Sequence, residues 1–232
     1  MEITVVVDNS PPMDNKLKSV WGLALYVSMN DINFMFDTGP SSIILERNMR
    51  HLELDPKKLD FVIISHIHAD HTGGLAFLGK KKRMRLYLSK NSFYRSWYKV
   101  LGFDVIIVES FMKIHDEIYV TGPLDSYIKE QSAIIKHEKG LIILTGCSHP
   151  GIEKILKFVR ENFDEKIYAL IGGLHLGLKT DYDLSRIVDA FEKFNVREFY
   201  PLHCTGKKAI KFFEEYIPEK IKKTYTGLKI VI

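Results

Sequence analysis

The chain has 232 residues, is 46% hydrophobic and carries a formal net charge of +4, so it can bury a sizeable core. It has no apolar run of membrane-spanning length and only two cysteines, Cys147 and Cys204. These features exclude a helical membrane protein and a secreted disulfide framework, and we expect a soluble, cytoplasmic protein. A single glutamine among many Lys, Glu and Ile residues is typical of proteins from hot environments.

Apolar runs and turn residues predict strands and helices in alternation. In the first half we expect strands at 1–7, 21–29, 32–36, 61–64, 85–88 and 105–108, and helices at 41–51, just after residue 73 and at 89–101. In the second half we expect strands at 113–119, 133–137, 141–144, 167–171, 198–200 and 224–232, and helices at 151–163, 182–194 and 207–216. This order predicts an α/β fold with two mixed β-sheets flanked by helices, in one domain over residues 1–232.

A cluster of metal-competent side chains follows the apolar run 61–64. His66 and His68 are two residues apart, so they project to the same side if the strand continues that far. Asp70 and His71 follow where the backbone turns, before Gly73 and Gly74. Four such side chains within six residues, at the end of a buried strand, indicate a metal site rather than a polar surface loop.

The stretch from His66 to His71 resembles the His-x-His-x-Asp-His signature of the metallo-β-lactamase superfamily. The resemblance implies an αββα sandwich with a dinuclear metal site. It further implies that His66, His68 and His149 bind one ion, and that Asp70, His71 and His203 bind the other. Asp37, in Asp37-Thr38-Gly39, matches an early aspartate of that family that orients the ligands.

Other apolar strands also end in polar groups that this site could use. Asp37, His149, His175 and His203 each follow such a strand, and convergence at strand ends is how α/β proteins assemble a site. By itself His175 is equally compatible with a satisfied core histidine. The aspartate that bridges the two ions in most family members is absent, and Cys147, His175 or a water are alternative replacements.

The three later motifs resemble one branch of that superfamily, the dihydropterin-methyl-ribofuranosylaminobenzene phosphate synthases. They are Gly146-Cys147-Ser148-His149-Pro150-Gly151, Gly172-Gly173-Leu174-His175-Leu176 and His203-Cys204-Thr205-Gly206. The branch implies a transferase that joins an aminobenzene phosphate to a dihydropterin with loss of diphosphate.

We therefore expect a metal-dependent hydrolase of a phosphorylated or ester-type small molecule, or alternatively this diphosphate-releasing transferase. The cofactors are two divalent metal ions, with zinc preferred and iron or manganese as alternatives. Asp70 and His175 are expected to take part in catalysis, with His175 as a proton donor or substrate contact. Lys207 and Lys208 could hold a phosphate at the start of their helix, although a solvated first turn explains them equally well.

Basic and aromatic residues alternate from Lys80 to Tyr98, a mixture that also occurs in nucleic-acid interfaces. A solvated turn followed by a helix with core aromatics is the preferred interpretation, so nucleic acid is not an expected partner. A nuclease, and a metal-binding redox or sensor protein using Cys147 and Cys204, remain lesser alternatives. No membrane partner is expected, and a homo-oligomer is left open.

Overall fold

The computed structural model describes residues 1–90 and 95–232, and its contacts divide into two compact units. The first unit comprises residues 1–109 and 225–232, and the second comprises residues 110–224. No helix among the described residues is long and apolar enough to cross a membrane. The expectation of one domain over the whole chain stays a prediction.

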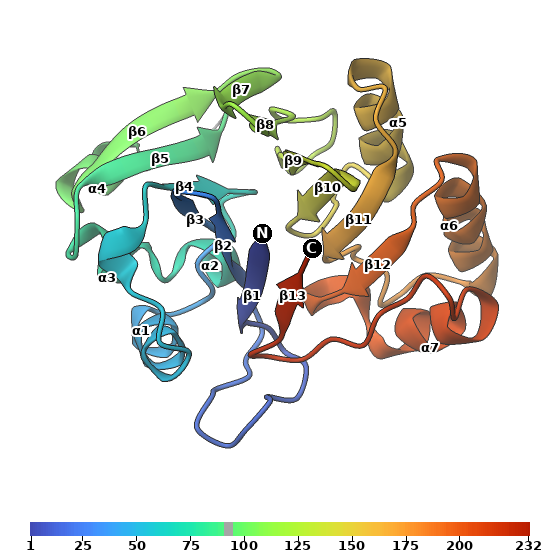
Figure 1. Cartoon of the computed structure of the whole chain (residues 1–232), viewed down its shortest axis with the longest axis horizontal. Helices are drawn as coiled ribbons and strands as arrows, with labels where there is room; N and C mark the ends of the chain where they lie inside the picture. The colour runs from blue at the N-terminus through green and yellow to red at the C-terminus, as the bar shows by residue number, and fades with distance from the viewer. Residues whose placement is uncertain (91–94) are drawn as a thin grey trace. The chain divides into compact units, whose positions relative to one another are not determined.

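The first unit contains a seven-stranded sheet with the order β13-β1-β2-β3-β4-β5-β6 (Figure 1). Its strands are β1 (Glu2–Val7), β2 (Ala24–Met29), β3 (Ile32–Phe36), β4 (Phe61–Ile64), β5 (Met84–Ser89), β6 (Phe103–Val108) and β13 (Lys229–Val231). Its helices are α1 (Ser42–His51), η1 (Pro56–Lys58), α2 (Ala69–Thr72), α3 (Leu75–Gly79) and α4 (Arg95–Val100). Side chains of α1, α3 and α4 share one apolar core with the strands.

Strand β4 occupies the middle of a parallel group. It pairs with β3 on one side and with β5 on the other, and β5 pairs with β6, all in parallel. All four of its residues are buried, which explains the unbroken apolar run in the sequence. The carboxyl ends of these strands therefore lie at the same edge of the sheet, where the residues that follow them are brought together.

The second unit contains a six-stranded sheet with the order β12-β11-β10-β9-β8-β7. Its strands are β7 (Met112–His115), β8 (Ile118–Val120), β9 (Ala133–His137), β10 (Gly140–Thr145), β11 (Ile167–Gly172) and β12 (Glu198–Pro201). Its helices are α5 (Ile152–Asn162), α6 (Asp181–Lys193), η2 (His203–Thr205) and α7 (Lys207–Tyr216). Helices α5, α6 and α7 lie along β10, β11 and β12 and share an apolar core with them (Figure 1).

Both sheets mix parallel and antiparallel pairs and both are flanked by helices, which confirms the predicted fold class. The predicted final strand 224–232 is too long, because Gly227 adopts a φ of 96° in a turn and only Lys229–Val231 is a strand. The predicted strand 21–29 begins only at Ala24, because Gly22 has a φ of 142°. The predicted strand 113–119 is instead the hairpin of β7 and β8.

The segment from Lys80 to Tyr98 differs from the expected turn and helix. Ser89 continues β5 by pairing with Val108, so no helix begins there, and the described helix is Arg95–Val100. Tyr87 and Tyr98 are buried, as expected for core aromatics, whereas Trp97 is 58% exposed. Phe93 and Tyr94 lie outside the described residues. The expectation that nucleic acid is not a partner stays a prediction.

Candidate metal centre

The end of β4 carries the first histidine cluster, which consists of His66, His68, Asp70 and His71. His66 and His71 are fully buried and their ring centroids lie 4.2 Å apart. Nε2 of His66 lies 3.0 Å from Nδ1 of His68, close to the roughly 3.3 Å expected for two nitrogens bound tetrahedrally to one zinc ion. A carboxylate oxygen of Asp70 lies 3.7 Å from Nε2 of His71. The spacing in the sequence thus brings four ligand-type side chains together in the first unit.

The buried carboxylate of Asp37, at the end of β3, organises this cluster. Its Oδ1 accepts the backbone N–H of Ser65, and its Oδ2 accepts the Ser65 hydroxyl, each at 2.7 Å. The same Oδ2 lies 2.7 Å from Nδ1 of His71. Because a carboxylate only accepts, Nδ1 of His71 carries the proton and Nε2 carries the lone pair.

The Ser65 hydroxyl extends this arrangement to His66. Since its proton is donated to Asp37, its oxygen accepts from Nδ1 of His66 at 2.9 Å. Both buried histidines are therefore held through Nδ1, and in each ring Nε2 is the nitrogen that could bind a metal ion. Carboxylates that fix histidine ligands in this way are typical of metal sites. Asp37 makes the contacts that its predicted orienting role requires, and the role itself stays a prediction.

Two glycines after the cluster permit close packing of the short helix α2. A Cβ on Gly73 would lie 2.1 Å from the backbone oxygen of Pro40, and one on Gly74 would lie 2.2 Å from that of Thr38. The Thr38 N–H and hydroxyl both donate to the carbonyl of His71, at 2.8 and 2.9 Å. The two glycines in the motif therefore allow the backbone of residues 73–74 to lie close to that of Thr38 and Pro40. The hydrogen bonds from Thr38 fix the backbone of His71, as Asp37 fixes its ring.

In the second unit, Glu130 performs the equivalent function for His149. Its carboxylate, 1% exposed, accepts the backbone N–H groups of Cys147, Ser148 and His149, each at 2.8 Å. Oε2 also lies 2.7 Å from Nδ1 of His149, so this ring too keeps its lone pair on Nε2. The loop after β10 is thus wrapped around one buried carboxylate.

The histidines after β11 and β12 lie on backbone in the left-handed region. His175 has a φ of 53° and His203 a φ of 47°, and Ser148 has a φ of 57°. Non-glycine residues rarely adopt this conformation, and it clusters at functional sites. The rings of His149 and His175 have centroids 5.0 Å apart, and His175 is exposed whereas His203 is buried.

Two buried thiols lie beside these histidines. Sγ of Cys204 accepts the N–H of His175 at 3.2 Å, and the ligand atoms of Cys147, His175 and Cys204 all lie within 4.8 Å of one another. Hydrogen bonding from Cys147, and secondarily from His175, lowers the pKa of the Cys204 thiol to about 5 against the effect of burial. A side-chain hydrogen bond with Cys204 raises the pKa of His175. Neither cysteine forms a disulfide among the described residues.

Sequence reasoning missed Glu130 because the residue belongs to no motif. Its hydrogen-bond partners lie in a loop 17 to 19 positions further along the chain. The one feature of the sequence that could have indicated it is the position of this charged residue shortly before the apolar strand β9.

The predicted phosphate-binding role of Lys208 is not favoured, since its ammonium lies 2.7 Å from Asp181 and also donates to the Lys179 carbonyl. Lys207 is exposed.

Known proteins are similar to this chain in sequence and in fold. The family model described as the metallo-beta-lactamase superfamily matches residues 23–152, more than half of the chain. The chain belongs to the metallo-β-lactamase superfamily. The predicted family is therefore confirmed, and with it a metal-dependent superfamily whose members include enzymes that act on small molecules.

The chain is similar to the 7,8-dihydropterin-6-methyl-4-(β-D-ribofuranosyl)-aminobenzene-5'-phosphate synthase of Methanocaldococcus jannaschii. The two are 30% identical over an alignment 244 residues long, gaps included. The alignment covers 83% of this chain and 82% of the relative. An uncharacterised protein of the same organism is 28% identical, covering 90% of this chain and 92% of its own length. Among solved structures, a metal-dependent hydrolase of the β-lactamase superfamily has a TM-score of 0.88 and 30% identity, and covers 100% of this chain and 99% of its own.

Proposed function

We propose that this chain is a metal-dependent hydrolase that uses two divalent ions to act on a phosphorylated or ester-type small molecule. The observation that carries the proposal is the pair of buried carboxylates, each bonded to Nδ1 of a histidine. Asp37 holds His71 in the first unit, and Glu130 holds His149 in the second. Metal-ligating histidines almost always donate their second ring N–H in this way.

The donor set fits divalent metal ions. In the proposal His66, His68 and His149 bind one ion, and Asp70, His71 and His203 bind the other, as the superfamily signature implies. Imidazole and carboxylate donors suit zinc, and also iron or manganese. Bound ions of this kind polarise a substrate oxygen and lower the pKa of a coordinated water.

The chain's own residues supply orientation and proton transfer. Asp37, Ser65 and Glu130 fix the tautomers of the ligand histidines before metal binds. Asp70 and His175 are the proposed catalytic residues. The imidazole of His175 is exposed and its ring centroid lies 5.0 Å from that of His149, a position from which it can donate a proton to a leaving group.

A diphosphate-releasing transferase is the second candidate, and the 30% identity to the dihydropterin synthase supports it. The same ligands would then stabilise charge on the departing diphosphate, with no attacking water. Incubation of the metal-loaded protein with simple phosphodiesters, thioesters and lactones separates the two candidates. Turnover of any of them supports hydrolysis, and uniform inactivity favours the transferase.

Metal content tests the proposal directly. Elemental analysis of the full chain purified without added metal is expected to give about two ions per chain, with losses in Asp70→Ala and His149→Ala. His51→Ala, an exposed histidine on α1, is the matched control and should retain both ions. A chain that binds no zinc, iron or manganese even after reconstitution would overturn the proposal.

A further inference from the structure

The fold of the second unit brings the chain's two cysteines together, although they are 57 positions apart in the sequence. Cys147 lies in the loop after β10, and Cys204 lies in η2, after β12. Their Sγ atoms are within 4.8 Å of each other. The sulfurs of a disulfide are about 2.05 Å apart, so these two have less than about 3 Å to close.

Backbone groups fix the position of the Cys204 sulfur. Its Sγ accepts the N–H of His175 at 3.2 Å, and its S–H donates to the carbonyl oxygen of Cys147 at 3.9 Å. A Cβ on Gly173 would lie 2.7 Å from the same sulfur, so the absence of a side chain there leaves the space that the sulfur occupies. The Cys204 thiol is therefore held against the loop that carries Cys147.

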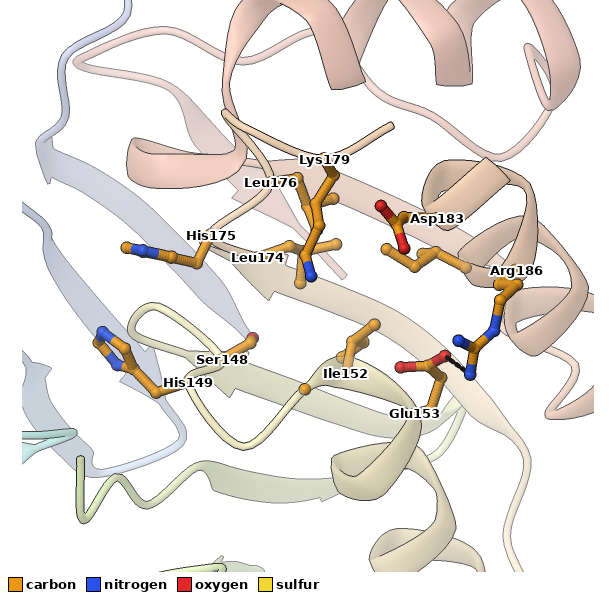
Figure 2. A pocket seen from close by; sticks show the side chains of 12 residues that line it. Ser148, His149, Ile152, Glu153, Leu174, His175, Leu176, Lys179, Asp183 and Arg186 are labelled. Atoms are coloured by element: carbon orange, nitrogen blue, oxygen red, sulfur yellow. Dashed lines mark hydrogen bonds and ion pairs between the residues drawn. The ribbon is translucent and has the colours of Figure 1, made fainter. Parts of the chain in front are cut away.

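A cavity of about 230 Å³ reaches the residues beside this pair (Figure 2). Its lining includes Ser148, which follows Cys147 in the chain, and His175, whose N–H contacts Cys204. Figure 2 shows both lining side chains at the end of the hollow away from Arg186 and Glu153. Two cations and two anions line it and balance in charge, namely Lys179, Arg186, Glu153 and Asp183. A small uncharged molecule therefore meets no net field on its way to the thiols.

We propose that Cys147 and Cys204 form an oxidation site at which hydrogen peroxide converts the two thiols into a disulfide. One sulfur attacks a peroxide oxygen and the O–O bond breaks, which gives a sulfenic acid and one water. The other sulfur then attacks the sulfenic sulfur and the S–O bond breaks, which releases a second water. In total the two thiols lose two electrons and two protons, and one peroxide becomes two waters.

The burial of both sulfurs favours closure between them. Cys147 and Cys204 are 3% and 5% exposed, so a bulky dissolved thiol reaches a sulfenic acid there less easily than the neighbouring cysteine does. The disulfide ties the loop after β10 to η2, the segments that carry His149 and His203. Because the oxidation requires only the two cysteines, it does not depend on the proposed function.

Peroxide treatment of the full chain, reduced beforehand with dithiothreitol and then desalted, tests the inference. Thiol titration in denaturant should find both cysteines before treatment and neither afterwards. Peptide mapping should find residues 147 and 204 in one cross-linked peptide, and dithiothreitol should restore both thiols. Cys147→Ser and Cys204→Ser are the matched variants, and neither should give a cross-link within the chain.

Three results would overturn the inference. They are retention of both thiols by the treated wild-type chain, addition of oxygen to either sulfur in place of the cross-link, and a disulfide that joins two copies of the chain. Non-reducing electrophoresis separates the last result from a bond within one chain. The wild-type measurements need neither variant, so a variant that fails to fold does not affect the outcome.

Discussion

Replacing Glu130 by glutamine tests the hydrogen bonds that hold the loop after β10 in the second unit. The substitution keeps the shape of the side chain but turns one carboxylate oxygen into an N–H donor. If the amide oxygen faces Cys147 and Ser148, the amide nitrogen meets the backbone N–H and Nδ1–H of His149, two donors that Oε2 accepts in the native chain.

The cost follows from those two lost hydrogen bonds. Hydrogen bonds to a charged group contribute about 1.5–3 kcal/mol each, so their loss amounts to about 3–6 kcal/mol. His149 can recover one bond by moving its proton from Nδ1 to Nε2, and we therefore expect the free energy of unfolding to fall by about 2–5 kcal/mol. The same proton shift blocks Nε2 of His149, the nitrogen proposed to bind metal, so metal affinity should fall by about 10–100-fold.

Urea denaturation followed by far-ultraviolet circular dichroism measures the first effect on chelator-treated protein. Competition with a chromophoric chelator measures the second. Glu153→Gln is the control, because it removes only the surface pair with Arg186, at a side chain 42% exposed, and should cost less than about 1 kcal/mol. Stability within about 0.5 kcal/mol of wild type, together with unchanged metal affinity, would refute the reasoning.

Four further predictions follow from other parts of the chain. Asp37→Asn removes the charged acceptor for Ser65 and His71, so chelator competition should report metal affinity lower by about 10–100-fold; an unchanged value would contradict the orienting role. Asn48→Ala removes three hydrogen bonds that the buried Asn48 side chain of α1 makes with the backbone of Val6 and Lys18, and urea denaturation should show a loss of about 2–4 kcal/mol. Burial raises the pKa of Tyr26 to about 12. The stability linked to its neutral form is therefore fully present below pH 10 and is lost as pH rises through about 12. Denaturation measured at several pH values should show that Tyr26→Phe loses less stability than wild type over that interval. Chelation should lower the thermal midpoint and added zinc should restore it, whereas an unchanged midpoint would argue against structural use of metal.

The sequence was most informative where local spacing decides the outcome. The sequence placed His66 and His68 two residues apart, and their ring centroids lie 4.5 Å apart. The strand itself does not continue that far, because β4 ends at Ile64. The ends of strands were less predictable, because they depend on backbone conformation. The positive φ of Gly22 and Gly227 shortened two strands that apolar content alone made too long.

Contacts between residues distant in the sequence explain what could not be predicted. Glu130 has no motif of its own, and its partners are mostly backbone N–H groups, which every residue except proline has. Lys208 seemed suited to a phosphate until the fold placed Asp181 beside it. Such pairings are set by the packing of α6 and α7, and no local pattern records them.

The left-handed backbone at the strand ends has a consequence for attempts to engineer this protein. Among the described residues, seven other than glycine have positive φ, and four of them are Asp37, Ser148, His175 and His203. Each such conformation costs about 1–3 kcal/mol, so a screen for thermostability would select glycine or asparagine at these positions and remove residues of the proposed metal centre. Glu53 shares the conformation but is not one of the predicted site residues. Glycine or asparagine at this position would relieve backbone strain without removing a proposed ligand, which makes it the better starting point for a more stable protein.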